Sequence, residues 1–152
     1  MRRRNQRPLG LLFEPVTVTE SSNFAARAPP AGRALADVIT KALAQAGASN
    51  AVEGNVYLDL NGETFRANEW GYTLLRTRQA CQLDSWSQHI SAMSFGETGA
   101  AAPLLALCLA ARAFSRGYGR GRHALILVSG DDGHRAGMVL EYPFSAQARS
   151  HR

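Results

Sequence analysis

The spacing of apolar residues along the chain predicts three helices. Apolar side chains recur three and four positions apart through RALADVITKALAQAG (33–47), which predicts an amphipathic helix that ends at Gly47. NEWGYTLLRTRQACQ (68–82) repeats the pattern more weakly. Residues 100–116 form a third stretch of helical length, which is almost wholly apolar.

Short runs of β-branched and apolar residues predict five strands. They lie between the helices, at 11–22, 55–60, 88–94, 123–129 and 136–142. Strands that alternate with helices favour an α/β domain with a layered, mostly parallel sheet. The last two strands are joined by GDDGHR, which predicts a terminal antiparallel hairpin. We expect one domain over 10–143, with a basic tail before it (1–9) and a flexible tail after it (144–152).

The stretch SAMSFGETGAAAPLLALCLAARAF (91–114) ends in the most apolar helix of the chain. This helix has no polar side chain before Arg112, and a helix that is apolar on all sides is expected to be buried on all sides. Pro103 is tolerated only in a first turn, so regular helix should begin near Ala101 or Ala102. The glycines of FGETGAAA favour close helix packing over an anion site, because no lysine accompanies them and a glutamate would repel the anion.

Composition indicates a globular protein that neither crosses a membrane nor binds nucleic acid. Of 152 residues, 45% are hydrophobic and 19% are charged, and no apolar run reaches the ~18 residues of a membrane span. The tails hold six of the 17 basic residues, so the remaining 11 are balanced by 12 acids and no basic face is expected. The apolar run near the start is too short for a signal peptide, which favours a cytoplasmic protein. Cys81 and Cys108 lie in apolar stretches, which predicts buried, reduced thiols.

No residue pattern points to a metal, a cofactor or a catalytic pair. Asp131, Asp132 and His134 lie in a glycine-flanked segment that is typical of a turn alone. His89 and His123 have no partner in the sequence, and the serines beside the strands lie in no nucleophile-elbow motif. We therefore expect no bound metal and no cofactor.

The order of these elements resembles the C-terminal half of the β-ketoacyl synthases of the thiolase superfamily. RALADVITKALAQAG followed by NVYLDLNGE is similar to the family's helix and the strand that ends in a His-Gly-Thr motif. SAMSFGETGAAAPLLALCLAARAF is similar to its lysine-bearing strand, Gly-His pair and buried helix, and ALILVSGDDGHRAGMVLEY to its closing glycine-rich loop and hairpin. The resemblance implies a thiolase-like fold and an acyltransferase ancestry.

The positions that carry the family's chemistry hold other residues in this chain. Asn61 stands where the resemblance places the first histidine, Ser91 where it places the lysine, and Gly96 where it places the second histidine. The nucleophilic cysteine belongs to the family's N-terminal half, and neither Cys81 nor Cys108 matches its position. Because condensation needs a thiolate and donors for the developing oxyanion, we expect no enzymatic activity.

Three functional hypotheses follow from the resemblance. The first is a non-catalytic module that acts through protein–protein contact. The second is the C-terminal half of a split β-ketoacyl synthase whose nucleophilic cysteine lies on another chain, and the third is a gene remnant without a function. Shortened thiolase-like proteins encoded beside type VI secretion effector genes are similar to this chain, which implies an accessory role towards an effector or its chaperone.

The resemblance also implies a partner. In the thiolase fold, two similar halves pack their buried helices against one another between two sheets, and this chain matches one half. If three or four leucines of this helix stayed exposed to water, the domain would lose roughly 5–10 kcal/mol of burial free energy, which is comparable with the stability of a domain. We therefore predict self-association or pairing with a second thiolase-like chain. The contact residues are predicted to be Leu104, Leu105, Cys108 and Leu109.

Overall fold

A mixed β-sheet forms the centre of the structure, a computed structural model that describes residues 8–142. Its strands are, in chain order, β1 (Leu11–Leu12), β2 (Val16–Thr19), β3 (Asn55–Leu58), β4 (Ser87–Ile90), β5 (His123–Ser129) and β6 (His134–Glu141). Across the sheet they are ordered β1-β6-β5-β3-β4, and β2 also pairs with β6. Apart from residues 8 and 9, the predicted tails fall outside the described residues.

The directions of the strands confirm the predicted mixture. β3 is parallel to both β4 and β5, whereas β6 is antiparallel to β5 and to the two N-terminal strands. The single strand predicted at 11–22 is two strands, since Glu14 and Pro15 interrupt it. Proline has no N–H to donate to a ladder. The sheet therefore has six strand segments, and both N-terminal segments lie along the same edge of β6.

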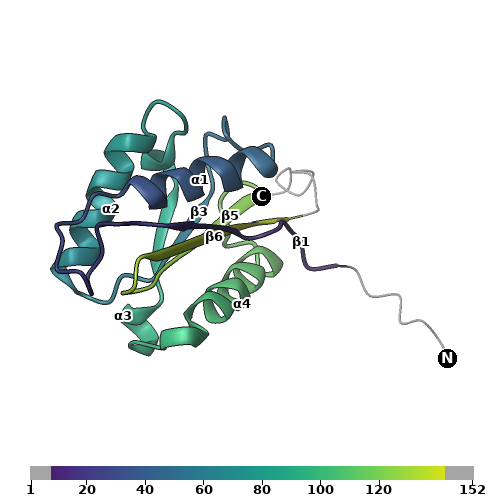
Figure 1. Cartoon of the computed structure of the whole chain (residues 1–152). Helices are drawn as coiled ribbons and strands as arrows, with labels where there is room; N and C mark the ends of the chain where they lie inside the picture. The colour runs from purple at the N-terminus through teal and green to yellow at the C-terminus, as the bar shows by residue number, and fades with distance from the viewer. Residues whose placement is uncertain (1–7, 143–152) are drawn as a thin grey trace.

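Helices cover both faces of the sheet and give three layers (Figure 1). They are α1 (Arg33–Gln45), α2 (Thr64–Thr77), the short α3 (Ala92–Phe95) and α4 (Ala102–Ser115), with 3₁₀ turns η1 (Leu83–Ser85) and η2 (Gly99–Ala101). α1 and α2 lie on one face, and α4 lies on the opposite face with α3 near its start. α4 begins at Ala102 with Pro103 in its first turn, as the sequence predicts.

α1 forms where the apolar spacing predicts it. Its inward side is buried against the sheet through Leu35, Val38, Ile39, Ala42 and Leu43. Gly47 has a positive φ of 62°, which favours glycine after a helix end. The N–H groups of Gly47 and Ala48 donate to the carbonyls of Ala44 and Leu43, and this pattern ends the helix.

Several predicted boundaries are wrong, and those of α2 and β4 shift most. α2 begins four residues before the predicted start and ends at Thr77, whose carbonyl accepts the N–H of Cys81 in a turn. The strand predicted at 88–94 stops at Ile90, where its pairing with β3 also stops. The next residues coil into α3, because the N–H groups of Ser94 and Phe95 return to the carbonyl of Ser91. A short apolar run does not by itself distinguish these two outcomes.

Each face of the sheet has its own hydrophobic core. The core beneath α1 and α2 is the larger one, and it includes Trp70 and Trp86. The core beneath α4 consists of Tyr57, Ala106, Ala110, Phe114, Ala124, Ile126 and Leu140. No helix among residues 8–142 has the length and apolarity needed to cross a membrane.

The N-terminus of α1 is capped by a side chain from the end of β2. The Glu20 carboxylate accepts the N–H groups of Arg33 and Ala34 at 2.9 and 3.0 Å, and its residue is 4% exposed. Burial alone would raise the pKa of this carboxyl, but the N–H donors of Ala34, Arg33 and Ser22 and the charge of Arg135 together lower it. A carboxylate here also complements the positive end of the helix dipole.

Glu20→Gln is therefore expected to lower the free energy of unfolding by about 1–2 kcal/mol at neutral pH. Because folding lowers the pKa of Glu20, its stabilisation is present above the ordinary value of 4.5 and is lost as the pH falls below it. Urea unfolding at pH 7 and at acidic pH should show the difference between the two proteins shrinking on acidification. An unchanged difference would contradict this role of the charge.

Candidate functional site

The carboxyl ends of the three parallel strands meet at one edge of the sheet. β3, β4 and β5 run in the same direction, so Asp59, Ser91 and Gly130 follow them at that edge. In open α/β sheets, ligands bind outside the carboxyl ends of the strands. The positions at which the resemblance places catalytic groups fall in the segments that follow these ends.

An arginine from α2 occupies the space between the ends of β3 and β5. Arg66 Nη1 donates to Asp59 Oδ2 at 2.9 Å and to the Ser129 carbonyl at 2.7 Å. Its Nη2 donates to Asp131 Oδ1 at 2.9 Å and its Nε to Glu63 Oε2 at 3.1 Å. All three nitrogens of the guanidinium are thus bonded, and an ion-pair network bridges the ends of β3 and β5.

Asp59 is the most enclosed acid of this network. Burial raises the pKa of the Asp59 carboxyl, and the hydrogen bond from the Ser129 N–H and the charge of Arg66 offset only part of the rise. Sequence reasoning missed both Asp59 and Arg66. The spacing of Glu63 and Arg66, three residues apart at a helix start, could have indicated their ion pair. The pairing of Arg66 with Asp131 could not be predicted, because the two residues are distant in sequence.

The side chain of Asn61 is committed to contacts within the chain. Its Oδ1 accepts the N–H of Glu63 at 3.2 Å, and its side chain also hydrogen-bonds to the Glu97 carboxylate. The bond from Asn61, followed by that from the Gly99 N–H, lowers the pKa of Glu97. These contacts bring the segment after β3 against the segment after α3.

Ser91 and Gly96 lie at the two ends of α3. Ser91 is half-buried at the end of β4, whereas Gly96 is exposed with a φ of 73°. A Cβ atom built on Gly96 or on Gly99 would meet no atom within 4 Å. The expectation that these glycines allow close helix packing is therefore wrong. They permit positive φ angles in an exposed turn.

The remaining polar candidates serve the structure. Asp131 belongs to the Arg66 network. Asp132 lies in the exposed turn, with its Oδ2 3.8 Å from Nε2 of His134, the exposed first residue of β6. His89 stacks on Tyr57 with ring centroids 4.7 Å apart. Burial lowers the pKa of His89 and raises that of Tyr57 to about 12. Within residues 8–142, no three His, Cys, Asp or Glu side chains are arranged to hold a metal ion.

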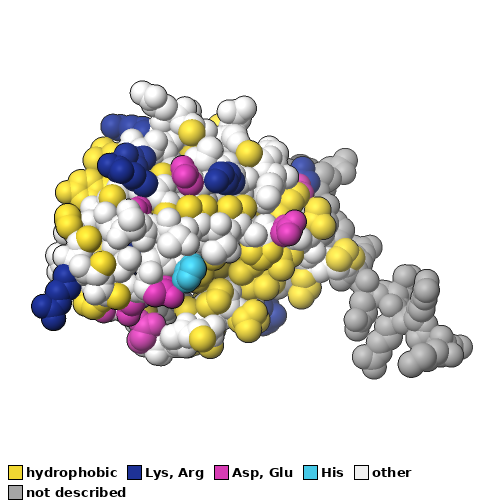
Figure 2. All heavy atoms as spheres, viewed as in Figure 1, with side chains coloured by type: hydrophobic (Ala, Val, Ile, Leu, Met, Phe, Trp, Pro, Cys, Tyr) yellow, Lys and Arg dark blue, Asp and Glu magenta, His cyan; other side chains and the backbone are white. Residues whose placement is uncertain are grey.

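Within the described residues α4 is buried on one side only, so the burial on all sides that the sequence leads us to expect is not reached within a single chain. Its sheet-facing side chains are Ala106, Ala110 and Phe114, which are buried. On the opposite side Leu104 is 64% exposed and Cys108 is exposed, and Leu105 is half-buried. Leu109 is half-buried because it packs against the core beneath α4. Figure 2 shows hydrophobic side chains gathered over this region. A single sheet covers only one side of a helix, so the apolar outward side is left without a cover.

The two cysteines differ in their surroundings. Cys81 is buried as predicted, and burial raises the pKa of its thiol. The prediction of a buried Cys108 is wrong, because this residue lies on the outward side of α4. Both cysteines are free, and neither lies in the Arg66 network.

The architecture is that of a thiolase-like ketosynthase fold, with a mixed sheet between helical layers. The Streptomyces albus JA3453 oxazolomycin ketosynthase domain OzmH KS7 superposes with a TM-score of 0.76 at 18% identity over 91% of this chain. The ishigamide ketosynthase/chain length factor superposes with a TM-score of 0.64 at 21% identity, also over 91% of this chain. The chain spans about a third of each structure, 31% and 36% respectively. No family model and no curated protein matches the sequence.

Proposed function

We propose that the chain is a non-catalytic thiolase-like module of the cytoplasm that acts by binding a second thiolase-like chain, foremost a second copy of itself. The contact is the outward side of α4. The observation that carries this proposal is the exposure of Leu104 and Cys108 on the helix that the sequence makes apolar on every side.

The apolar surface extends beyond α4. On the same side of the sheet, α3 leaves Met93 83% exposed and Phe95 56% exposed (Figure 1). Burying one exposed leucine is worth about 1.5–3 kcal/mol, and contiguous exposed apolar patches usually mark interfaces. A second thiolase-like chain would offer a matching apolar helix.

The lack of chemistry at the strand ends supports a non-catalytic role. Asn61, Ser91 and Gly96 stand where the resemblance places two histidines and a lysine. Arg66 and its three carboxylates occupy the space between the ends of β3 and β5. A condensing enzyme needs a thiolate and oxyanion donors. Neither Cys81 nor Cys108 belongs to this network, and the donors at the edge, Arg66 and Asn61, already bond to carboxylates.

The comparisons support the second thiolase-like chain as the partner. The ketosynthase structures are about three times as long as the part that this chain matches, so most of their mass lies outside it. The name of one of them joins a ketosynthase with a chain length factor. This chain would gain the corresponding cover for α4 from another polypeptide.

Leu104→Lys together with Cys108→Lys is expected to convert a dimer into a monomer. Two buried lysines would leave their charges desolvated at the contact, whereas on the free chain both positions face solvent. Sedimentation velocity at micromolar concentration measures the change. Leu105 and Leu109 are less suitable, because they are half-buried within the chain.

The matched control is Leu75→Lys, an exposed leucine on α2 at the opposite face, which should remain dimeric. A bismaleimide should also link two copies through Cys108, since Cys81 is buried. A compact monomer that is unchanged by these substitutions would contradict self-association. If that monomer then binds a cysteine-bearing thiolase-like chain, or a secretion effector or its chaperone, the partner is that protein instead.

A further inference from the structure

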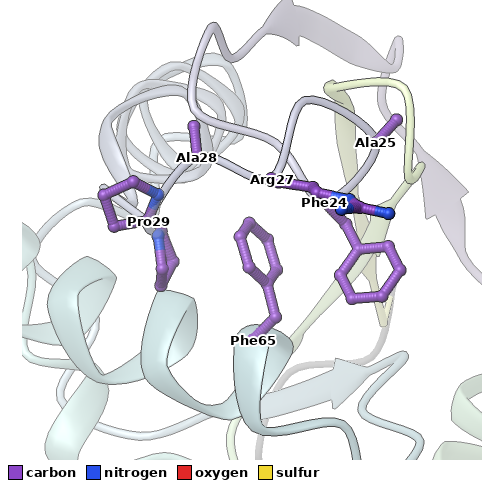
Figure 3. A pocket seen from close by; sticks show the side chains of 7 residues that line it. Phe24, Ala25, Arg27, Ala28, Pro29 and Phe65 are labelled. Atoms are coloured by element: carbon purple, nitrogen blue, oxygen red, sulfur yellow. The ribbon is translucent and has the colours of Figure 1, made fainter.

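A pocket of about 640 Å³ lies between the loop that precedes α1 and the start of α2. Its lining residues are Phe24, Ala25, Arg27, Ala28, Pro29, Pro30 and Phe65. The Phe24 and Phe65 rings meet edge to face, with centroids 5.8 Å apart and planes at 78°. Figure 3 shows the Phe65 ring pointing from α2 into the space between Pro29 and Phe24. Apart from Arg27 every lining side chain is apolar, and the volume lies within the usual range for ligand pockets.

The loop that forms the pocket is held in place by its own hydrogen bonds. Asn23 Oδ1 accepts the N–H of Ala26 at 2.9 Å, and the Phe24 carbonyl accepts the N–H of Arg27 at 3.0 Å. This turn gives Arg27 a φ of 53°, a left-handed conformation that is uncommon for a side chain of its size. The N–H of Ala25 donates to the Asp131 carbonyl, which ties the loop to the turn after β5. The pocket is therefore formed before any ligand arrives.

The charges around the pocket are uneven. Arg27 is exposed and makes no ion pair within residues 8–142. At the proline end, Arg76 Nε donates to the Ala31 carbonyl at 2.8 Å, and its guanidinium also has no acidic partner in the described part of the chain. The acids nearest the other end, Glu63 and Asp131, are paired with Arg66. A negative group is thus favoured beside Arg27 and towards Pro30, and disfavoured towards the Arg66 network.

We propose that this pocket binds a peptide segment of a partner protein that carries an aromatic side chain next to acidic residues. The aromatic ring would enter between Phe24, Phe65 and the prolines, and the carboxylates would lie along Arg27 and Arg76. No buried polar group fixes the orientation of a small molecule here, whereas a peptide is oriented by its flanking residues. The pocket lies at α2, on the face opposite α4, so this binding is independent of the proposed α4 contact.

The test is a titration of ¹⁵N-labelled protein with acetyl-Phe-Glu-Glu-amide, followed by amide chemical shifts. Saturable shifts are expected at residues 24–28, 31 and 65. Acetyl-Ala-Glu-Glu-amide and acetyl-Phe-Lys-Lys-amide should bind at least several-fold more weakly, because each removes one of the two contacts. The Leu104→Lys, Cys108→Lys protein should bind the probe equally, which separates this result from that on self-association.

Two substitutions in exposed positions test the residues. Arg27→Gln should weaken binding of acetyl-Phe-Glu-Glu-amide about two- to five-fold, which is the effect of losing one exposed ion pair. Binding of acetyl-Phe-Lys-Lys-amide should be unchanged or improved. Phe24→Ala should weaken the binding of both peptides that contain phenylalanine, acetyl-Phe-Glu-Glu-amide and acetyl-Phe-Lys-Lys-amide. Arg116→Gln, an exposed arginine after α4, is the matched control and should have no effect. Equal binding of all three peptides, shifts outside the pocket, or no shifts up to about 10 mM would overturn the proposal.

Discussion

Arg135→Met is expected to lower the free energy of unfolding by about 3–5 kcal/mol, the cost of leaving a buried charge without its partner. Arg135 Nε and Nη2 donate to the Glu69 carboxylate at 2.9–3.1 Å, and the two side chains are only 1% and 2% exposed. Nη1 also donates to the Gly130 and His134 carbonyls. The pair joins α2 to the start of β6, so its loss should also loosen the turn before that strand.

Urea unfolding of three proteins checks this expectation. The double variant Glu69→Leu, Arg135→Met should recover much of the loss, because it removes both charges and refills the space with apolar groups. Arg78→Met is the matched control. It removes an arginine that is paired with Asp84 at 3.6 Å on the surface, and should change the free energy by less than about 1 kcal/mol. If Arg135→Met also lowers the free energy of unfolding by less than about 1 kcal/mol, the expectation is wrong, and water reaches the Glu69 carboxylate.

Phe114→Ala is expected to cost about 3–5 kcal/mol by opening a cavity beneath α4. The Phe114 side chain is buried and stacks on Tyr142, with centroids 5.2 Å apart. Gly119 lies against the same ring, since a Cβ built there would fall 2.4 Å from it. Because Phe114 anchors the last turn of α4, its loss should also weaken the proposed contact between copies.

The measurement is urea unfolding at one fixed protein concentration, since association adds to apparent stability. Leu75→Ala, which truncates an exposed leucine on α2, should stay within about 0.5 kcal/mol of the parent protein. An equally small change for Phe114→Ala would mean that α4 is held to the sheet by other residues.

The sequence determined the elements and their order, because these depend on local periodicity. The apolar spacing of 33–47 and Gly47 after it define α1, and Pro103 defines the start of α4. The alternation of strands and helices led to the layered mixed sheet, including the hairpin of β5 and β6. The boundary between β4 and α3 was less predictable, since it depends on where the pairing of β4 with β3 stops. The bounds of α2 were also missed, because its apolar pattern is weak and its end is a turn between Thr77 and Cys81.

The contacts between distant segments were decided only by the tertiary structure. Glu20 caps a helix that begins 13 residues later, and Arg66 binds Asp131, 65 residues away. Neither partner is marked by a local pattern, because each depends on how the sheet and helices are placed around it. The same holds for Cys108: composition makes α4 apolar all round, but only the sheet decides which side is covered. Which residues of α4 face outward is therefore a property of packing, while the need to cover them was already present in the sequence.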